Sequence, residues 1–277
     1  MLQKSYDNSP TLYLIPTPIG NMEDMTIRSI NTLKMVDIIL AEDTRVAREL
    51  LSHFDIKKKV FSNYKYNETS NYNKVLELLR EGKNIGLISD RGTPAISDPG
   101  NMIASYIISQ GFNVVALPGA TAFVPALTMS GLDTTHFTFY GFLDSRENKQ
   151  KSELKALLNV NGTLIFYESP HRLLTTLGNI LEVFGDRKIS ISREITKKYE
   201  EVFRGKISEY LSEKKVLKGE FVIVVDGSNL KKDFSELSIN EHLSFYLNQG
   251  IDIKEAMKTV AKERKFSKSD IYREYHK

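Results

Sequence analysis

The chain has 277 residues, 41% of them hydrophobic, so it can bury a sizeable core and is long enough for two domains. It has no cysteine, which excludes disulfides, thiolate metal sites and cysteine nucleophiles. The net charge of +3 neither requires nor excludes a nucleic-acid partner. A polar N-terminal stretch and the lack of a long apolar run predict a soluble, cytoplasmic protein without a membrane span.

The first half alternates short strand-like runs with helical patterns. The runs are residues 12–15, 36–41, 59–64, 85–89 and 114–117, with helices expected at 71–80 and from Asn101 to Gly111. This alternation predicts a parallel sheet covered by helices. Three of the runs break into Pro- and Gly-rich loops, within 12–21, 85–100 and 114–122. Ligands of parallel α/β sheets lie outside the carboxyl ends of the strands, so these loops are expected to form the site.

The second half has strand-like runs at 137–143, 162–169, 188–195 and 219–227, with an unassigned segment at 201–213 and fewer helices between the runs. We therefore expect another α/β region with more antiparallel pairing. Helices are expected at 145–158 and from Pro170, where Ser169 is a candidate N-cap. The aromatic residues Phe137, Phe139, Tyr140 and Phe142 are expected in the core.

In the last part of the chain, the sequence predicts a polar linker over 228–236, followed by two or three short helices. Ser267 or Ser269 is expected as an N-cap. The expected organisation is an N-terminal α/β domain at 1–120, a C-terminal α/β domain at 121–229 and a small helical region at 237–277. Lysines gather at 57–59, at 149–155 and along 254–265, where a solvated face explains them as well as a binding role does.

The sequence lacks the motifs of several common classes of nucleotide-binding protein, hydrolase and zinc enzyme. No two glycines stand as G-x-G, and the Walker A, G-x-S-x-G and H-E-x-x-H patterns are absent. The five histidines are not at ligand spacing, so no metal site is expected.

Seven segments, in order, closely resemble the bacterial 16S rRNA (cytidine-2′-O)-methyltransferases, which belong to the tetrapyrrole methylase superfamily. The segments are LYLIPTPIGNMEDMTIRSINTL, VDIILAEDTRVARELLSHFDI, IGLISDRGTPAISDPG, VVALPGATAFVPALTMSGL, TLIFYESPHRLLTTL, SREITKKYEEVFRG and GEFVIVV. The resemblance implies two α/β domains of the tetrapyrrole methylase type, S-adenosylmethionine as methyl donor, and a homodimer. It also implies 2′-O-methylation of a cytidine in the 16S rRNA of the 30S subunit.

Carried over motif by motif, the resemblance implies a set of donor-binding residues from both domains. They are Pro18, Ser89, Asp90, Thr93, Thr121 and Ala122, followed by Tyr167 or Glu168, Ile195, Gly219 and Phe221. Arg91 departs from the small residue that relatives usually have. It either points outward to an RNA phosphate or narrows the donor pocket.

Candidate catalytic and RNA-binding residues follow from their place in the expected crevice. A ribose hydroxyl must lose its proton, which a carboxylate could accept, and the candidates are Asp43, Glu42 and Asp98. Asp43 or Thr44 could equally cap the helix that follows. Possible phosphate contacts are Arg28, Arg45, Arg48, Arg91 and Arg172. Two other functions remain open: a C-methyltransferase acting on a tetrapyrrole, and a noncatalytic RNA-binding protein.

Overall fold

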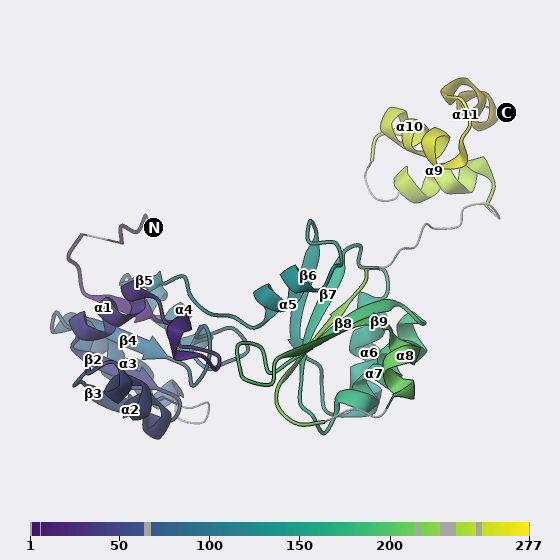
Figure 1. Ribbon diagram of the computed structural model, residues 1–277. Coiled ribbons are helices and arrows are strands. Elements are labelled where there is room, and N and C mark those ends of the chain that lie inside the picture. The colour runs from purple at the N-terminus through teal and green to yellow at the C-terminus, as the bar shows by residue number, and fades with distance from the viewer. Residues whose placement is uncertain are drawn as a thin grey trace. The chain divides into compact units, whose positions relative to one another are not determined.

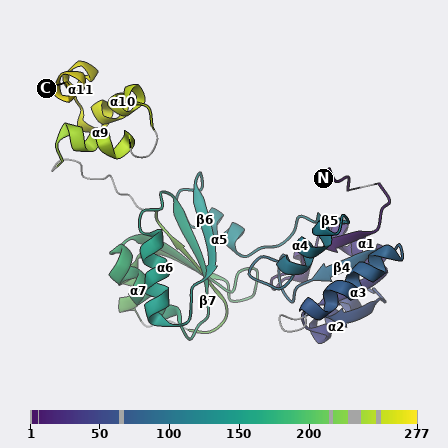
Figure 2. The same cartoon turned by 180° about the vertical axis from the view of Figure 1, so that it is seen from behind.

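The computed structural model describes residues 2–5, 7–63, 68–213, 217–227, 237–247 and 251–276. The chain divides into two compact units, Met1–Gly227 and Ser228–Lys277. The first unit contains two five-stranded sheets, drawn in Figures 1 and 2. The linker expected over 228–236 and the last residue of the run at 59–64 lie outside the described residues.

The first sheet is wholly parallel, with the strand order β3-β2-β4-β1-β5. This confirms the parallel, helix-covered sheet predicted from the alternating pattern. The strands are β1 (Thr11–Leu14), β2 (Ile38–Ala41), β3 (Lys59–Ser62), β4 (Ile85–Ile88) and β5 (Asn113–Ala116). The helices are α1 (Ile27–Met35), α2 (Thr44–His53), α3 (Glu68–Arg80) and α4 (Asn101–Ser109), with a 3₁₀ turn, η1, at Met22–Asp24.

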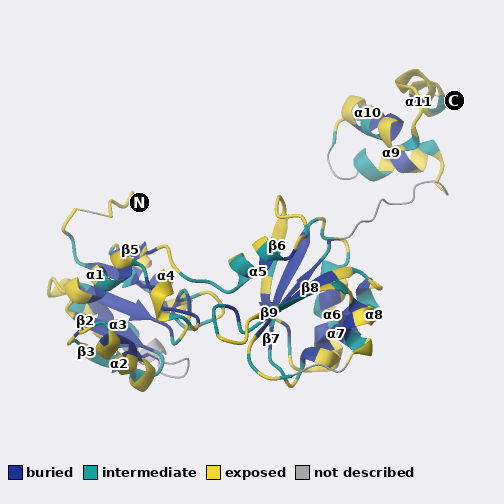
Figure 3. Ribbon diagram, in the orientation of Figure 1, coloured by how far each residue is buried: buried dark blue, intermediate teal, exposed yellow. Residues whose placement is uncertain are grey.

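Apolar side chains cover both faces of this sheet. Ile39 packs with Leu33 and Leu50 on one side, while its neighbour Leu40 packs with Val75 on the other. β2 and β4 are buried at every position and have no polar side chain, as is typical of strands buried on both faces. Figure 3 shows β4, at the centre of the sheet, in the dark blue of buried residues. The loops at the carboxyl ends of the strands are therefore carried on a rigid core.

The second sheet is mixed, with the order β6-β7-β10-β8-β9. Only β6 and β7 pair in parallel, which confirms the expected antiparallel pairing. The elements are α5 (Phe123–Met129), β6 (Phe137–Phe142), α6 (Glu147–Leu157), β7 (Thr163–Glu168), α7 (Leu173–Phe184), β8 (Lys188–Arg193), β9 (Glu201–Lys206), α8 (Ile207–Ser212) and β10 (Phe221–Val225). Helices α6, α7 and α8 contribute to the core on one face, and α5 packs against β7, β8 and β10.

Two local expectations in this region were wrong. The helix expected from Pro170 begins at Leu173, and the Ser169 hydroxyl donates to Glu168 (3.3 Å) and does not cap the helix. The aromatic run of β6 is not a core strand: Phe137, Tyr140 and Phe142 are exposed. A β-bulge shifts the register between Phe139 and Gly141 and changes which faces the side chains occupy.

The second unit is a bundle of three short helices, α9 (Ile239–Leu247), α10 (Ile253–Arg264) and α11 (Lys268–Tyr275). Leu243, Val260 and Ile271 are buried in its core. Ser267 caps α11 by accepting a hydrogen bond from the Asp270 N–H (3.2 Å). Of the two serines predicted as possible caps, Ser267 is therefore the one that caps the helix. In the described parts of the chain, no helix combines the length and apolar character that crossing a membrane requires.

Candidate functional site

The three Pro- and Gly-rich loops follow β1, β4 and β5, which are adjacent strands of the first sheet. Thr17 and Gly92 exchange two backbone hydrogen bonds of 2.9 and 3.0 Å, joining the first loop to the second. The Thr93 hydroxyl donates to the Ala120 carbonyl at 3.0 Å, joining the second to the third. Neighbouring parallel strands thus bring together segments that are far apart in the sequence.

A cavity of about 290 Å³, called the loop cavity below, lies against these loops. Its other lining residues come from the second sheet and its loops. The full lining is Ile19, Arg91, Gly92, Thr93, Ile96, Ser97, Asp98, Thr121, Ala122, Phe142, Tyr167, Glu168, Ser169, Pro170, Gly219, Glu220, Phe221 and Val222. Both α/β regions are therefore needed to form it.

Most of the predicted donor-binding residues line the loop cavity: Thr93, Thr121, Ala122, Tyr167, Glu168, Gly219 and Phe221. Pro18, Ser89, Asp90 and Ile195 lie outside that lining. Ser89 and Ile195 are buried, and the Ser89 hydroxyl donates to the Gly92 carbonyl at 3.1 Å. The structure thus places Ser89 behind the lining, where it fixes the shape of the second loop.

Tyr167 joins the second sheet to α5. Its hydroxyl oxygen accepts a hydrogen bond from the Phe123 N–H at 3.2 Å. Burial raises the pKa of Tyr167 to about 12, so the phenol is neutral at physiological pH. The ring of Phe139 packs edge-on against it, with 4.9 Å between centroids. Tyr167 therefore presents an aromatic, uncharged surface to the cavity.

Asp98 is the one of the three candidate catalytic carboxylates that lines the loop cavity. Burial raises the pKa of Asp98 to about 7, and the nearby charges of Glu42 and Asp90 contribute to the rise. Burial also raises the pKa of Glu42, again with contributions from Asp90 and from Asp43. A carboxyl group with a pKa near the working pH is suited to accept a proton and release it again.

Asp43 has a different environment. Its side chain caps α2 by accepting from the Arg45 N–H at 2.8 Å, and the Arg45 guanidinium donates to it at 2.6 Å. The hydrogen bonds from Arg45 lower the pKa of Asp43 to about 2. Its own N–H donates to Asp90 Oδ1 at 2.9 Å. The capping role expected for Asp43 is confirmed, and its low basicity makes it the weaker candidate for proton transfer.

Two residues near Asp98 have a strained backbone. Ala95 and Ser97 have positive φ angles of 70° and 63°, a region that residues other than glycine rarely occupy. Such conformations each cost about 1–3 kcal/mol and are found mainly where function maintains them. The second loop therefore has a geometry fixed by its surroundings, with a cavity-lining carboxylate at its centre.

Arg91 forms an ion pair with Glu220, which lies at the start of β10 beside Gly219 and Phe221. Glu220 also accepts from Lys197 Nζ at 2.7 Å, and the same ammonium donates to Glu194 at 2.7 Å. Both Arg91 and Glu220 line the loop cavity. The Arg91 side chain therefore lies along the loop cavity, where its guanidinium is paired with Glu220.

The other predicted RNA-binding arginines are distributed over the first unit. Arg28 on α1 and Arg45 and Arg48 on α2 are exposed, and Arg45 is paired with Asp43. Arg172 is directed inward: its Nη2 donates to the carbonyls of Leu143 and Asp144, both at 2.9 Å. The structure does not gather the five arginines into one patch.

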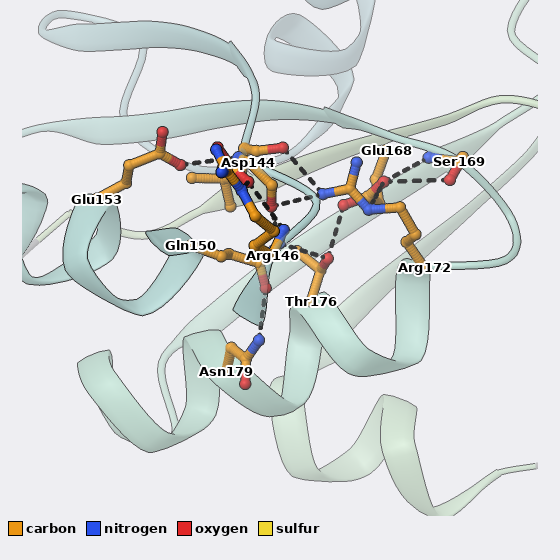
Figure 4. A network of polar contacts seen from close by, with 10 residues as sticks. Asp144, Arg146, Gln150, Glu153, Glu168, Ser169, Arg172, Thr176 and Asn179 are labelled. Atoms are coloured by element: carbon orange, nitrogen blue, oxygen red, sulfur yellow. Dashed lines mark hydrogen bonds and ion pairs between the residues drawn. The ribbon is translucent and has the colours of Figure 1, made fainter. Parts of the chain in front are cut away.

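Glu168 is the centre of a buried polar network, shown in Figure 4. Its side chain is 1% exposed. The Ser169 N–H donates to Oε1 at 2.7 Å, and the Thr176 hydroxyl donates to Oε2 at 2.6 Å. Gln150 extends the network by donating to the Thr176 hydroxyl at 3.1 Å. The carboxylate thus holds α6 and α7 against the end of β7.

Glu168→Ala is expected to lower the free energy of unfolding by about 3 kcal/mol, because it leaves buried donors without an acceptor. Urea unfolding measures this loss. Glu147→Ala is the control, since it removes an exposed glutamate paired with Lys151 and should cost under about 1 kcal/mol. Equal losses of unfolding free energy in the two variants would show that the network around Glu168 contributes no more to stability than an exposed ion pair does.

Several residues that line the loop cavity were not predicted from the sequence. Ser169 and Pro170 follow β7 in a proline-containing loop, the same signal that identified the first three loops. Glu220 stands between two predicted residues, Gly219 and Phe221. For Phe142 no signal existed, because its position depends on the bulge in β6.

Comparison with known proteins agrees with this architecture. A family described as Tetrapyrrole (Corrin/Porphyrin) Methylases matches residues 11–211. A Bacillus subtilis (strain 168) protein named Ribosomal RNA small subunit methyltransferase I is 46% identical over 273 residues, covering 96% of this chain and 94% of that protein. A protein of the same name from Halalkalibacterium halodurans is 44% identical, covering 99% of this chain and 98% of that one.

Similar solved structures show the same fold. Uroporphyrin-III-C-methyltransferase from Thermus thermophilus superimposes with a TM-score of 0.57 and 21% identity, covering 78% of this chain and 94% of that one. Diphthine synthase gives a TM-score of 0.61 with 12% identity, covering 78% and 90%. At these identities the likeness extends to the fold only.

Proposed function

Because the chain belongs to the tetrapyrrole (corrin/porphyrin) methylase family, we propose that it transfers a methyl group from S-adenosylmethionine to RNA of the small ribosomal subunit. The acceptor we propose is the 2′-hydroxyl of a cytidine in 16S rRNA. The observation that carries the proposal is the 46% identity, over nearly the whole of both chains, to a relative named as a small-subunit rRNA methyltransferase.

The loop cavity supports this donor. Its volume of about 290 Å³ is close to the lower end of the range for small-molecule sites, about 300 Å³. Tyr167 and Phe221 offer apolar and aromatic surface for a purine. When bound, S-adenosylmethionine supplies an electrophilic methyl group on a sulfonium.

The protein's contribution would be positioning and proton acceptance. The loops after β1, β4 and β5 hold the reactants in line and exclude water, which supplies most of the rate in a displacement of this kind. Asp98 accepts the proton of the ribose hydroxyl, and burial, with the nearby charges of Glu42 and Asp90, keeps the pKa of Asp98 near neutrality. By analogy with the resembled family, the enzyme would act as a homodimer in the cytoplasm.

The decisive experiment measures transfer of labelled methyl to 30S subunits that lack native methylation, followed by digestion to nucleosides. Label in 2′-O-methylcytidine is expected. Label in another nucleoside would refute the acceptor. Donor binding without any transfer to RNA would favour a tetrapyrrole acceptor, to be tested next, and absence of donor binding would favour the noncatalytic RNA-binding protein.

A further inference from the structure

Four cationic side chains surround a hollow at the C-terminal end of α2. The hollow has a volume of about 520 Å³. Its lining is Arg48, Leu51, Ser52, Asp55, Ile56, Lys57, Lys58 and Lys59. Four cations against the single carboxylate of Asp55 give this lining an excess of positive charge. It is called the basic hollow below.

The cations of the basic hollow differ from Arg45 and Arg146, which form ion pairs. Arg45, one turn before Arg48, is paired with Asp43, and Arg146 is paired with Asp144. Within the described residues, by contrast, no carboxylate forms an ion pair with Arg48 or with the lysines at 57–59. Their charge is therefore available to an external anion.

The backbone holds these cations in fixed positions. At the end of α2 the Ile56 N–H donates to the Leu51 carbonyl at 2.8 Å, and the Asp55 N–H donates to the Ser52 carbonyl at 3.2 Å. Asp55 adopts the left-handed conformation, with φ of 54°, that this type of helix end requires. Lys59 then enters β3 opposite Ile38. Little backbone order has to be gained on binding.

Protection of a sheet edge explains only part of this arrangement. β3 is an edge strand, and lysines on edge strands prevent pairing with other chains. That accounts for Lys59, which lies in the strand. Edge protection does not account for Arg48, which lies on α2, or for the hollow between Arg48 and Lys59.

The basic hollow is distant from the reacting groups. Helix α2 begins beside the second loop, where the Asp43 N–H contacts Asp90, and its 10 residues extend about 15 Å from there. Arg48 lies halfway along α2, and Lys57, Lys58 and Lys59 follow its far end. A long polyanion can therefore contact the lysines while another of its nucleotides lies near the second loop.

We infer that the basic hollow binds phosphates of the substrate RNA away from the methylated nucleotide. The inference rests on the proposed function, since it concerns the same RNA. Arginine and lysine contacts to phosphate fix the register of a nucleic acid without reading its sequence. The enzyme would thereby select an extended, folded RNA over a short strand that contains the same cytidine.

The test compares Lys57→Gln/Lys59→Gln with Lys149→Gln/Lys155→Gln, which removes two exposed lysines from α6. Binding of each variant to 30S subunits and to deproteinised 16S rRNA is measured by cosedimentation from about 50 to about 200 mM salt. Loss of the two lysines of the hollow should weaken binding to both ligands about tenfold and reduce the salt slope by about 2. The KM for 30S subunits should rise in parallel, with kcat and donor affinity unchanged.

Equal affinities and salt slopes in the two variants would overturn the inference. Weakened binding to 30S subunits but not to deproteinised RNA would overturn it as well, because it would show that the hollow contacts a ribosomal protein. If the unmodified enzyme transferred no methyl group to either ligand, the proposed function would fail, while cosedimentation would still decide whether the hollow binds RNA.

Discussion

Asp98→Asn is expected to slow methyl transfer by about 100-fold or more while leaving donor affinity nearly unchanged. Asparagine keeps the shape of the side chain that lines the loop cavity but cannot accept a proton. Because the pKa of Asp98 is raised to about 7, the unmodified enzyme should become faster as the pH rises through 7, and the variant should lose this dependence. Single-turnover transfer and calorimetric donor titration provide the two measurements.

The same substitution has a stability signature of defined sign. With its pKa raised from 3.8 to about 7, Asp98 binds a proton in the folded protein at pH values where the unfolded chain has lost it. Its contribution to stability is therefore greatest at low pH and is lost as the pH rises through about 7. Asp98→Asn should unfold at a higher temperature than the unmodified protein at pH 8, and the advantage should shrink toward pH 5.

Asp43→Asn and Glu42→Gln are the comparators for this prediction. Both residues belong to the loop after β2, outside the cavity lining, and should keep most of the transfer rate. Loss of transfer in either variant, with normal transfer by Asp98→Asn, would move the role of proton acceptor to that residue.

Gly119→Ala is expected to weaken donor binding about tenfold and to lower the free energy of unfolding by about 1–3 kcal/mol. A methyl group at this position would overlap the ring of Pro16, with only 2.7 Å to its Cγ. A proline ring cannot move aside by rotating, so the loops after β1 and β5 must separate. Those loops carry Ile19, Thr121 and Ala122, which line the cavity.

Gly178→Ala is the matched control, because it makes the same chemical change on α7. No heavy atom lies within 4 Å of the added carbon, and alanine is favoured over glycine in helices by about 1 kcal/mol. This control should be at least as stable as the unmodified protein and should bind the donor normally. Urea unfolding and calorimetry compare the pair, and normal donor binding by Gly119→Ala would show that the two loops tolerate separation.

The predictable parts of this protein were those that local chemistry determines. Proline and glycine after apolar strands identified the three loops, and the cap of α2 was narrowed to Asp43 or Thr44, of which the structure shows Asp43. Asp98 could be named from its loop. The sequence could not show that Asp98 lies near Glu42. That proximity depends on β2 lying beside β4, and hydrophobic periodicity does not specify strand order.

The second sheet was harder to predict because its contacts depend on register and on helix direction. The bulge before Gly141 decides that Phe142 lines the cavity, and it has no clear pattern in the sequence. The resemblance carried Glu168 over as a donor-binding residue. Its hydrogen bond to Thr176, which is on the following helix, became visible only once α7 was seen to pack beside β7.

The position of β1 in the first sheet has a consequence for synthesis of the protein. This strand is made first, yet its partners are β4 and β5, with Leu12 opposite Ile85 and Val114. While the chain grows on the ribosome, the apolar segment at 12–15 is made about 100 residues before the second of its two partner strands. Until then at least one of its hydrogen-bonding edges stays unpaired. A nascent chain stalled before β5 should therefore recruit chaperones that recognise short apolar strands, and one stalled well beyond it should not.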